Sequence, residues 1–232
     1  MCGRLNIADP QKISNLLAGF NITLAPESFY AGRFKRATDT IAVLQNSESG
    51  YQLNPAIWWL LLERTMSGFK ASKYTSFNTR YDKLNVPRSA GYKAFRESRC
   101  IIPVNGFGES QYHNGKPLHY HDMMPENEVL LMGGLTRYWH HPQTAVVQQS
   151  CSVITLPPHP KLKHIHAKSM PLILPQEKTV IEQWLNPELT DVTQFDSLLE
   201  PHLPQSLYAT PIDKPSTYHA VGPVEMIAAD GR

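Results

Sequence analysis

The chain begins MCGR, which places Cys2 directly behind the initiator methionine. Chain ends usually tolerate change, so a terminal thiol can be inert. Removal of Met1 would instead leave an α-amine and a thiol on adjacent carbons, and pKa values near ~8 and ~8.5 keep both partly nucleophilic at neutral pH. Such a pair can attack a carbonyl twice, forming a Schiff base and then a thiazolidine ring. Alternatively, the thiolate alone can attack an amide with the amine as base.

Glu109 is the second candidate for chemistry. It lies in RCIIPVNGFGES (99–110), which we expect to be an apolar strand that runs into a glycine-bearing loop carrying the carboxylate. A carboxylate after a strand is commonly a solvated turn residue. If the loop folds inward, Glu109 can serve as a general acid or base. We expect Cys100, in the same segment, to be a small core residue.

TSFNTRYD (75–82) carries an amide and a guanidinium two positions apart, at Asn78 and Arg80. In an extended segment, side chains at this spacing share one side. An asparagine here can be an ordinary turn residue. Together the two groups could instead hold a carbonyl or phosphate oxygen.

Histidines cluster in KHIHAK (163–168), where His164 and His166 precede an apolar strand. A histidine close to Cys2 would be a proton shuttle at neutral pH. A metal site is a rival interpretation, since His119 and His121 have similar spacing. No acidic residue stands at a diagnostic distance from either pair, so we expect no metal and no other cofactor.

The composition is that of an ordinary soluble globular protein, with 41% hydrophobic and 18% charged residues among 232. No apolar run approaches the ~20 residues that span a bilayer, and the start lacks the features of a signal peptide. Three cysteines suggest neither a disulfide framework nor a CxxC zinc site. We therefore expect a cytoplasmic monomer without membrane contact. A net charge of +2 leaves the partner open, but the basic segments 32–36 and 159–168 permit a polyanion.

The elements that must position these residues can be outlined from periodicity and turn residues. We expect helices over 10–20, 89–98, 176–186 and 190–200, and strands over 40–45, 51–62, 99–104, 116–124, 128–139, 144–156 and near 223–229. This order lacks the regular alternation of parallel α/β folds. The sequence predicts one α+β domain over residues 1–232, with a mostly antiparallel, barrel-like β-sheet core and flanking helices.

Five segments occur in a characteristic order, namely MCGR, FNTR, RCIIPVNGFGES, GGLTRYW and HIHAKSMPLIL. In this combination the chain resembles the SRAP family (SOS-response-associated peptidases), whose members shield abasic sites in DNA. The resemblance extends from residue 2 to about residue 174. One departure is Gly108, which stands where the family usually has an aromatic residue before the glutamate. A second is the spacing after His166, where Met-Pro follows one residue later than usual.

The resemblance implies that Cys2, freed from Met1 by self-processing, condenses with the aldehyde of an abasic site in single-stranded DNA and closes a thiazolidine cross-link. It implies that Asn78 positions the reacting groups, that Glu109 assists sugar ring opening and that His166 catalyses Schiff-base formation. It also implies DNA contacts, for which the candidates on this chain are Arg4, Arg33, Arg36 and Arg80.

Two other functions fit parts of the pattern. Glutamine amidotransferases with an N-terminal cysteine also begin MCG, and Asn105-Gly106 could imitate their oxyanion hole. A non-catalytic reader of modified bases, with an inert Cys2, would bind DNA with strong salt dependence and form no adduct. His164 also stays an alternative to His166, because strand-like alternation would point both side chains to one face.

Overall fold

The computed structural model describes residues 3–113 and 115–231, and Cys2 lies outside these ranges. The strands are β1 (Arg4–Ile7), β2 (Gly32–Arg36), β3 (Thr40–Ser47), β4 (Gly50–Ile57), β5 (Leu62–Arg64), β6 (Phe69–Ala71), β7 (Asn78–Arg80), β8 (Arg99–Val104), β9 (Gly106–His113), β10 (Lys116–Pro125), β11 (Leu130–His140), β12 (Val147–Leu156), β13 (Met170–Pro171), β14 (Leu207–Ile212) and β15 (Glu225–Ile227). The α-helices are α1 (Pro10–Gly19), α2 (Tyr92–Glu97) and α3 (Lys178–Leu185). Four 3₁₀-helices are η1 (Pro26–Phe29), η2 (Tyr81–Lys83), η3 (Pro160–Leu162) and η4 (Val192–Leu199).

A closed barrel of five strands forms the centre of the structure. Its strand order is β11-β8-β3-β4-β12, and β12 pairs with β11 again to close the circle. All of these pairings are antiparallel except the short parallel contact between β12 and β4. The barrel interior is filled by apolar side chains such as Val43, Ile102 and Val153, each 0% exposed. The predicted α+β class with a mostly antiparallel, barrel-like core is confirmed.

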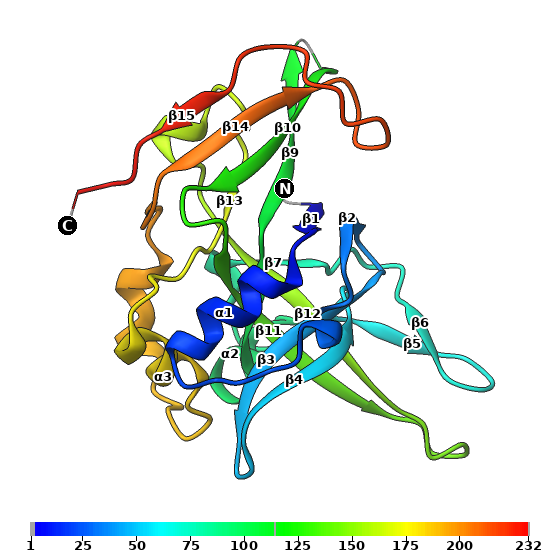
Figure 1. Cartoon of the computed structure of the whole chain (residues 1–232). Coiled ribbons are helices and arrows are strands. Elements are labelled where there is room, and N and C mark those ends of the chain that lie inside the picture. Colours follow the sequence, from blue (N-terminus) through cyan, green and yellow to red (C-terminus); the bar gives the residue numbers. More distant parts are fainter. Residues whose placement is uncertain (1–2, 114, 232) are drawn as a thin grey trace.

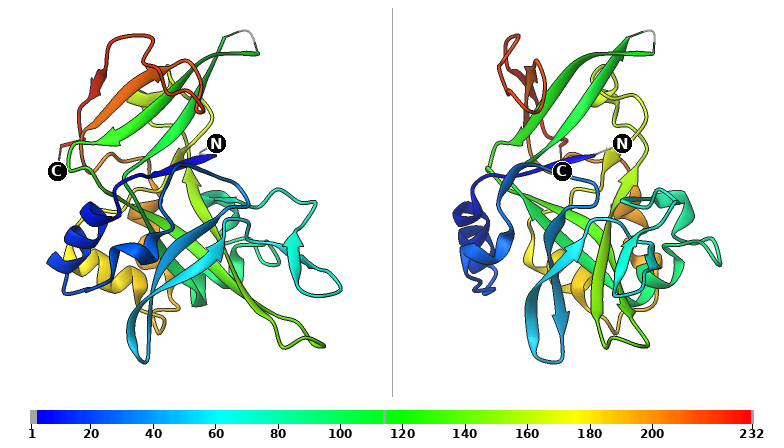
Figure 2. Two further views of the ribbon diagram at one scale, coloured as in Figure 1. Left: turned by 45° about the vertical axis from the view of Figure 1, so that its right-hand side comes forward. Right: turned by 90° about the vertical axis from the view of Figure 1, so that its right-hand side faces the viewer.

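A second sheet of six strands, in the order β15-β14-β10-β9-β1-β2, stands above the barrel (Figure 1). Two further views show that the β9–β10 hairpin extends away from the barrel and that β14 and β15 lie along it (Figure 2). Among the described residues no helix is long and apolar enough to cross a membrane.

One of the places where the chain passes between the two sheets is Asn105, where β8 of the barrel ends and β9 of the second sheet begins. The Asn105 side chain accepts a hydrogen bond from the Asp9 amide (2.9 Å) and donates to the carbonyls of Asp9 (3.2 Å) and Glu128 (3.1 Å). Its backbone amide donates to the Asn6 carbonyl (2.8 Å). The passage between the sheets is thereby tied to β1, to the start of α1 and to the turn before β11.

The N-terminal helix forms where the sequence predicts it. Asp9 is the N-cap, and its carboxylate accepts a hydrogen bond from the Lys12 amide (3.3 Å), while Pro10 occupies the first helical position. Ile13 and Leu17, four residues apart, are both 0% exposed and pack into the core. The predicted short helix near 89–98 and the helix near 176–186 are also present, as α2 and α3.

Two predicted elements are wrong in type or length. The segment predicted as an α-helix over 190–200 forms the 3₁₀-helix η4, which buries Val192, Phe195 and Leu199. The strand predicted over 51–62 ends at Ile57. Beyond it the chain turns toward 76–77, where the Trp58 indole donates to the Phe77 carbonyl (2.8 Å) and the Leu60 amide to the Ser76 carbonyl (3.0 Å).

The position of Glu109 also differs from the prediction. The segment after the apolar strand is the regular strand β9, and Glu109 lies within it instead of in a loop. The two glycines beside it suggested a loop, but they serve close backbone packing. A Cβ atom at Gly106 would lie 2.5 Å from the Met123 carbonyl oxygen, so only glycine fits at this point of the sheet.

Arg99, at the start of β8, binds the late helices to the barrel. The residue is 6% exposed. Its guanidinium donates hydrogen bonds to five backbone carbonyls, at distances between 2.7 and 3.1 Å. These carbonyls belong to Phe95, Arg96, Trp184, Asn186 and Leu189. The guanidinium carbon also lies 4.7 Å from the centre of the Phe195 ring. Burial lowers the pKa of Arg99 to about 10, so the side chain remains charged at neutral pH.

Replacement of Arg99 should therefore be costly. We expect Arg99→Met to lower the free energy of unfolding by about 2–4 kcal/mol, because several buried carbonyls lose their donors at once. Urea denaturation measures the loss. Arg96→Met is the matched control, since Arg96 donates to the carbonyls of Leu84 and Tyr92 in a less buried setting. Equal losses in the two variants would contradict this role for Arg99.

Candidate functional site

Glu109 of β9 and His166 form a buried pair, although 57 residues separate them in the sequence. Their closest atoms, Oε2 of Glu109 and Nδ1 of His166, are 3.4 Å apart. Both residues are almost fully buried, at 4% and 8% exposure. His166 lies in the turn after η3, which packs across the face of β9 that carries Glu109. The fold thus brings together two groups that can each transfer a proton.

An apolar wall stands behind this pair. A small void of about 10 Å³ is lined by Glu109, His166 and their neighbours Phe107, Met123, Leu162, Ile165, Ser169 and Met170. Such surroundings disfavour a charged carboxylate, and burial raises the pKa of Glu109 to about 7, while the positive charge of Arg4 works in the opposite direction. Glu109 is therefore divided between its acid and base forms at neutral pH.

His166 is held in the form of a neutral base. Burial lowers the pKa of His166 below its ordinary value of 6.5. Its Nδ1 atom also lies 3.3 Å from the Ser110 carbonyl oxygen, which can only accept a hydrogen bond. The hydrogen of the neutral ring therefore resides on Nδ1, and Nε2 is the basic nitrogen.

His121 lies directly opposite Glu109 on the neighbouring strand β10. It is 7% exposed, and burial, assisted by repulsion from His119, lowers the pKa of His121 to about 4. A neutral imidazole adds no positive charge that would favour an ionised Glu109. The sequence drew attention to His121 only as a possible metal ligand, and its position beside Glu109 follows from the strand register.

A cavity of about 210 Å³ opens in front of the pair. It is lined by Gly3, Arg4, Phe77, Gly108, Glu109, Ser110, Tyr112, His166 and Lys168. The lining combines the two proton-transfer groups with two cations and two aromatic rings. Gly3, which follows Cys2 in the sequence, is part of this lining.

Arg4 is fixed at the edge of the cavity by three neighbours. Its guanidinium donates to the Ser110 hydroxyl (3.0 Å) and lies 4.8 Å from the centre of the Tyr120 ring. Gly108 faces Arg4 across the β1–β9 pairing, and a Cβ atom there would lie only 2.8 Å from Arg4 Nε. The absence of a side chain at Gly108 therefore allows Arg4 to occupy its position.

On β2, the other neighbour of β1, Arg36 lies directly opposite Arg4. Residues opposite each other on neighbouring antiparallel strands project to the same face, where like charges repel. An anion bound over this face would relieve the repulsion. Arg36 is exposed, so such an anion could approach from solvent.

Asn78 and Arg80 both lie on β7, which runs parallel to β12. Phe77, directly before Asn78, lines the 210 Å³ cavity, whereas Asn78 itself is not among the described residues that line it. Arg80 lines a neighbouring cavity of about 380 Å³, and the two cavities share Lys168. The Arg80 guanidinium makes two hydrogen bonds to the Asp82 carboxylate, at 2.8 and 2.9 Å. A phosphate would have to compete with that carboxylate.

Arg33 has a different environment from the other three arginines. Its guanidinium carbon lies 3.9 Å from the centre of the Tyr218 ring, and its terminal nitrogen lies 3.9 Å from Asp122 Oδ2. Asp122 is 0% exposed and accepts hydrogen bonds from the Tyr218 hydroxyl and from Asn6. The structure thus places Arg33 beside a buried carboxylate that partly neutralises it.

His164 does not share the environment of His166. Its Nε2 lies 2.9 Å from the Glu225 carboxylate, and half of its side chain is exposed. The segment is a turn and not a strand, so the alternation expected from the sequence is absent. Within residues 3–113 and 115–231 no group of three or more His, Cys, Asp and Glu side chains is arranged to hold a metal ion.

Lys168 and Tyr112 line the cavity but were not among the candidates from the sequence. The basic composition of 159–168 could have drawn attention to Lys168 as a binding residue. Nothing in the sequence around Tyr112, an exposed tyrosine in a hairpin, indicates that it lines a cavity. Of the cysteines in the described ranges, Cys100 and Cys151 are fully buried, which raises the pKa of both thiols. Neither is suited to act as a nucleophile.

The structure also bears on the amidotransferase alternative. Asn105, considered as an oxyanion-hole residue, uses its side chain to join β9 to α1 and to the turn before β11. It is 2% exposed and does not line the cavity in the described part of the chain. Asn105 is therefore not placed to form an oxyanion hole in this cavity, and the Asn105-Gly106 pair no longer favours an amidotransferase.

Solved structures from two bacteria have a similar fold. A protein from Bacteroides thetaiotaomicron matches with a TM-score of 0.70 at 19% identity, covering 92% of this chain and 93% of that one. A protein from Bordetella bronchiseptica matches with a TM-score of 0.71 at 17% identity, covering 92% of this chain and 100% of that one.

Similar curated proteins carry a common description. The abasic site processing protein YoqW of Bacillus subtilis is 27% identical over 205 residues, which cover 87% of this chain and 88% of YoqW. The abasic site processing protein HMCES of Xenopus tropicalis is 27% identical over 201 residues, which cover 78% of this chain and 56% of HMCES. The model of the SOS response associated peptidase (SRAP) family matches residues 1–215. The chain therefore belongs to the SRAP family.

Proposed function

We propose that this protein forms a covalent thiazolidine cross-link between Cys2 and the aldehyde of an abasic site in single-stranded DNA. The observation that carries the proposal is the buried Glu109–His166 pair at the wall of a cationic cavity. Two proton-transfer groups next to a binding site for an anionic chain suit a carbonyl condensation on DNA. Relatives described as abasic site processing proteins support the same substrate.

The reaction proceeds in three steps. Opening of the deoxyribose ring moves the proton of the C1′ hydroxyl to the ring oxygen and leaves an aldehyde. The amine of Cys2 adds to that aldehyde and water leaves; the proton that the Cys2 thiol gives up stays on the nitrogen, so a protonated Schiff base stands beside a thiolate. The Cys2 thiolate then adds to the same carbon and closes the thiazolidine ring, while the former imine nitrogen keeps its proton as an amine. The proposal includes removal of Met1 by the protein itself, which exposes the amine.

Glu109 and His166 divide the proton transfers between them. With a pKa of about 7, Glu109 can donate a proton to the ring oxygen and later accept one at neutral pH. His166 is neutral at that pH and presents Nε2 as the base that takes a proton during the amine addition, and the imidazolium so formed can return it to the hydroxyl that leaves as water. Asn78, one residue from the cavity-lining Phe77, would orient the reacting carbonyl.

The cations around the cavity would hold the DNA backbone. Arg4 and Lys168 line the cavity itself, Arg36 faces Arg4, and Arg80 lies in the adjoining cavity. Lys168 also lies 6.0 Å from the centre of the Tyr112 ring. An aromatic ring beside cations suits an unpaired base next to its phosphate. Arg33 would contribute least, because Asp122 already partly neutralises it.

Covalent trapping tests the proposal directly. Mature protein mixed with single-stranded DNA that carries one abasic site should give a product stable to denaturation, seen as a shifted band on a denaturing gel. Cys2→Ser should give at most a reducible Schiff base, and an uncleavable N-terminal tag should abolish the stable product. Intact DNA is the control. If mature protein binds abasic DNA without any adduct, the covalent function is wrong and a non-catalytic reader replaces it.

The raised pKa of Glu109 should make the free energy of unfolding depend on pH. Its pKa rises from an ordinary value of 4.5 to about 7 in the folded protein, so its contribution to stability is complete below pH 4.5 and is lost as the pH rises through 7. Glu109→Gln cannot ionise. Between pH 5 and pH 8 wild-type protein should therefore lose about 1–3 kcal/mol of unfolding free energy relative to Glu109→Gln, measured by urea denaturation. The exposed Glu200→Gln is the control, and parallel pH curves for wild type and Glu109→Gln would contradict the burial effect.

The two neighbouring histidines can be separated by kinetics. His166→Ala should slow adduct formation by about 10²-fold or more, because the base next to Glu109 is removed. His164→Ala should change the rate less than 3-fold, since that side chain contacts Glu225 away from the cavity. The time course of adduct formation at saturating DNA distinguishes them. A slow His164 variant beside a normal His166 variant would reverse the assignment.

A further inference from the structure

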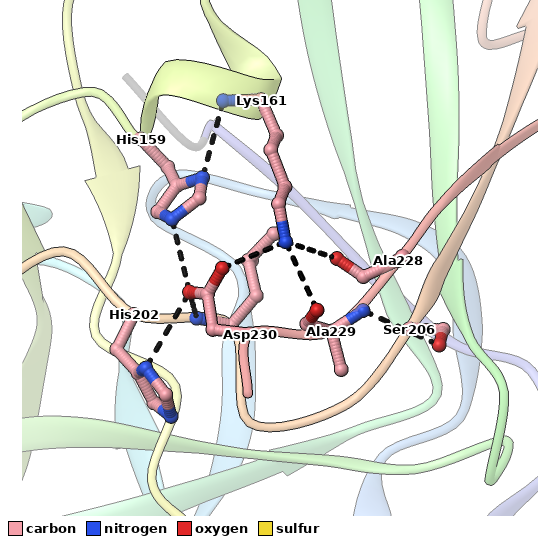
Figure 3. Close-up of polar contacts among 8 residues, drawn as sticks. His159, Lys161, His202, Ser206, Ala228, Ala229 and Asp230 are labelled. Carbon is pink, nitrogen blue, oxygen red and sulfur yellow. Dashed lines mark hydrogen bonds and ion pairs between the residues drawn. The ribbon is translucent and has the colours of Figure 1, made fainter. Parts of the chain in front are cut away.

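The C-terminal tail, residues 216–231, lies beyond the part of the chain that the family model matches. Within it, β15 pairs with β14 at the edge of the second sheet. Three residues after β15 the chain reaches Asp230, and Figure 3 shows Asp230 in contact with His159 and Lys161 at the start of η3. The tail therefore contacts the segment that leads directly to His166.

Asp230 is the centre of this contact. Its Oδ1 accepts a hydrogen bond from Lys161 Nζ (2.8 Å), and its Oδ2 accepts from His159 Nε2 (3.0 Å) and from the Leu203 amide (2.8 Å). His202 Nδ1 lies 3.4 Å from the same oxygen (Figure 3). Although partial burial opposes ionisation, Lys161, Leu203 and His159 lower the pKa of Asp230 to about 2, so it is a carboxylate throughout the neutral range.

The contacts on the side of η3 are equally specific. His159 Nδ1 accepts a hydrogen bond from the Lys161 amide (3.2 Å), so the hydrogen of a neutral ring lies on Nε2, where it is donated to Asp230. The contact thus needs no charge on His159, which is 6% exposed. Lys161 Nζ also donates to the carbonyls of Ala228 and Ala229 (both 2.9 Å), so three acceptors of the tail hold one ammonium group.

A short path leads from these contacts to the catalytic candidates. Leu162 ends η3, and its carbonyl accepts hydrogen bonds from the amides of Ile165 (3.0 Å) and His166 (2.8 Å). The side chains of Leu162 and Ile165 line the apolar wall behind Glu109. The turn that presents His166 to Glu109 is therefore built on a 3₁₀-helix whose first residues are held by Asp230.

We propose that Asp230 is a positioning residue: by binding His159 and Lys161 it fixes η3 and thereby sets the distance between His166 and Glu109. This inference rests on the proposed function for its kinetic consequence. Asp230 does not line the cavity, so it acts through His166 and not on the DNA. Loss of its negative charge would make this part of the surface more positive, which favours binding of a polyanion. A slower reaction would therefore come from misplacement and not from weaker binding.

Adduct kinetics on single-stranded abasic DNA test the positioning role. Asp230→Ala should lower the maximal rate of adduct formation about 10-fold and leave the half-saturating DNA concentration unchanged or lower, since small displacements of a proton-transfer group have effects of this size. Lys161→Met breaks the same contact from the other side and should also lower the maximal rate, whereas the loss of its positive charge should raise the half-saturating DNA concentration. The double variant should be no slower than the slower single variant. A maximal rate within 2-fold of wild type in both single variants, or multiplicative losses in the double variant, would overturn the proposal.

Asp196→Ala is the matched control, because it removes an equal charge from the exposed face of η4. It should leave both kinetic parameters unchanged. If Asp230→Ala fails to fold, Lys161→Met decides the question alone.

NMR of the His166 ring nitrogens separates the two proposals from each other. The signals are assigned by their absence in His166→Gln. Asp230→Ala and Lys161→Met should shift the His166 ring resonances and their titration midpoint, whereas Asp196→Ala should not. If wild-type protein forms no adduct, the proposed function fails, and the His166 spectra still report on positioning. Unchanged His166 spectra in both variants would overturn the role of Asp230 even where the cross-link forms.

Discussion

The arrangement of both sheets depends on the hydrogen bonds of one buried side chain, that of Asn105. At this residue a strand of the barrel continues as a strand of the second sheet, and its amide group is bonded to Asp9 and Glu128. A buried amide that loses its partners costs about 1–3 kcal/mol for each unsatisfied group. The passage is therefore stable only while α1 and the turn before β11 are in place. Four residues further on, strand alternation puts Glu109 on the same face as Phe107, against the apolar wall below η3. The raised pKa of Glu109 is thus a consequence of how the two sheets are joined.

The local elements could be predicted from the sequence because their signals are local. The Asp9-Pro10 cap and the spacing of Ile13 and Leu17 define α1, and the alternating or continuous apolar runs define most barrel strands. The type of η4 and the end of β4 could not be predicted, since both are decided by tertiary contacts. The glycines around Glu109 suggested a loop because a sequence cannot show that a backbone of the next strand, at Met123, lies against Gly106.

The candidate site divides in the same way. Glu109 and His166 could be singled out by residue type and by resemblance, and their contact follows only from the fold. The arginines show the limit of such reasoning, because their environments differ although their residue type is the same. Arg4 and Arg36 face each other, Arg80 is bound to Asp82, and Arg33 lies against Tyr218 and Asp122. No local pattern announces the partner of a surface arginine, since each partner comes from a distant segment or an adjacent turn.

Gly108 connects the electrostatics of the site to this chain's departure from its family. The resemblance leads one to expect an aromatic residue before the glutamate, and here a side chain at that position would collide with Arg4. Arg4 in turn lowers the pKa of Glu109 against the larger effect of burial. The pKa of Glu109 is raised by burial of the carboxyl, and Arg4, for which Gly108 makes room across the strand pairing, is one of the groups that lower it.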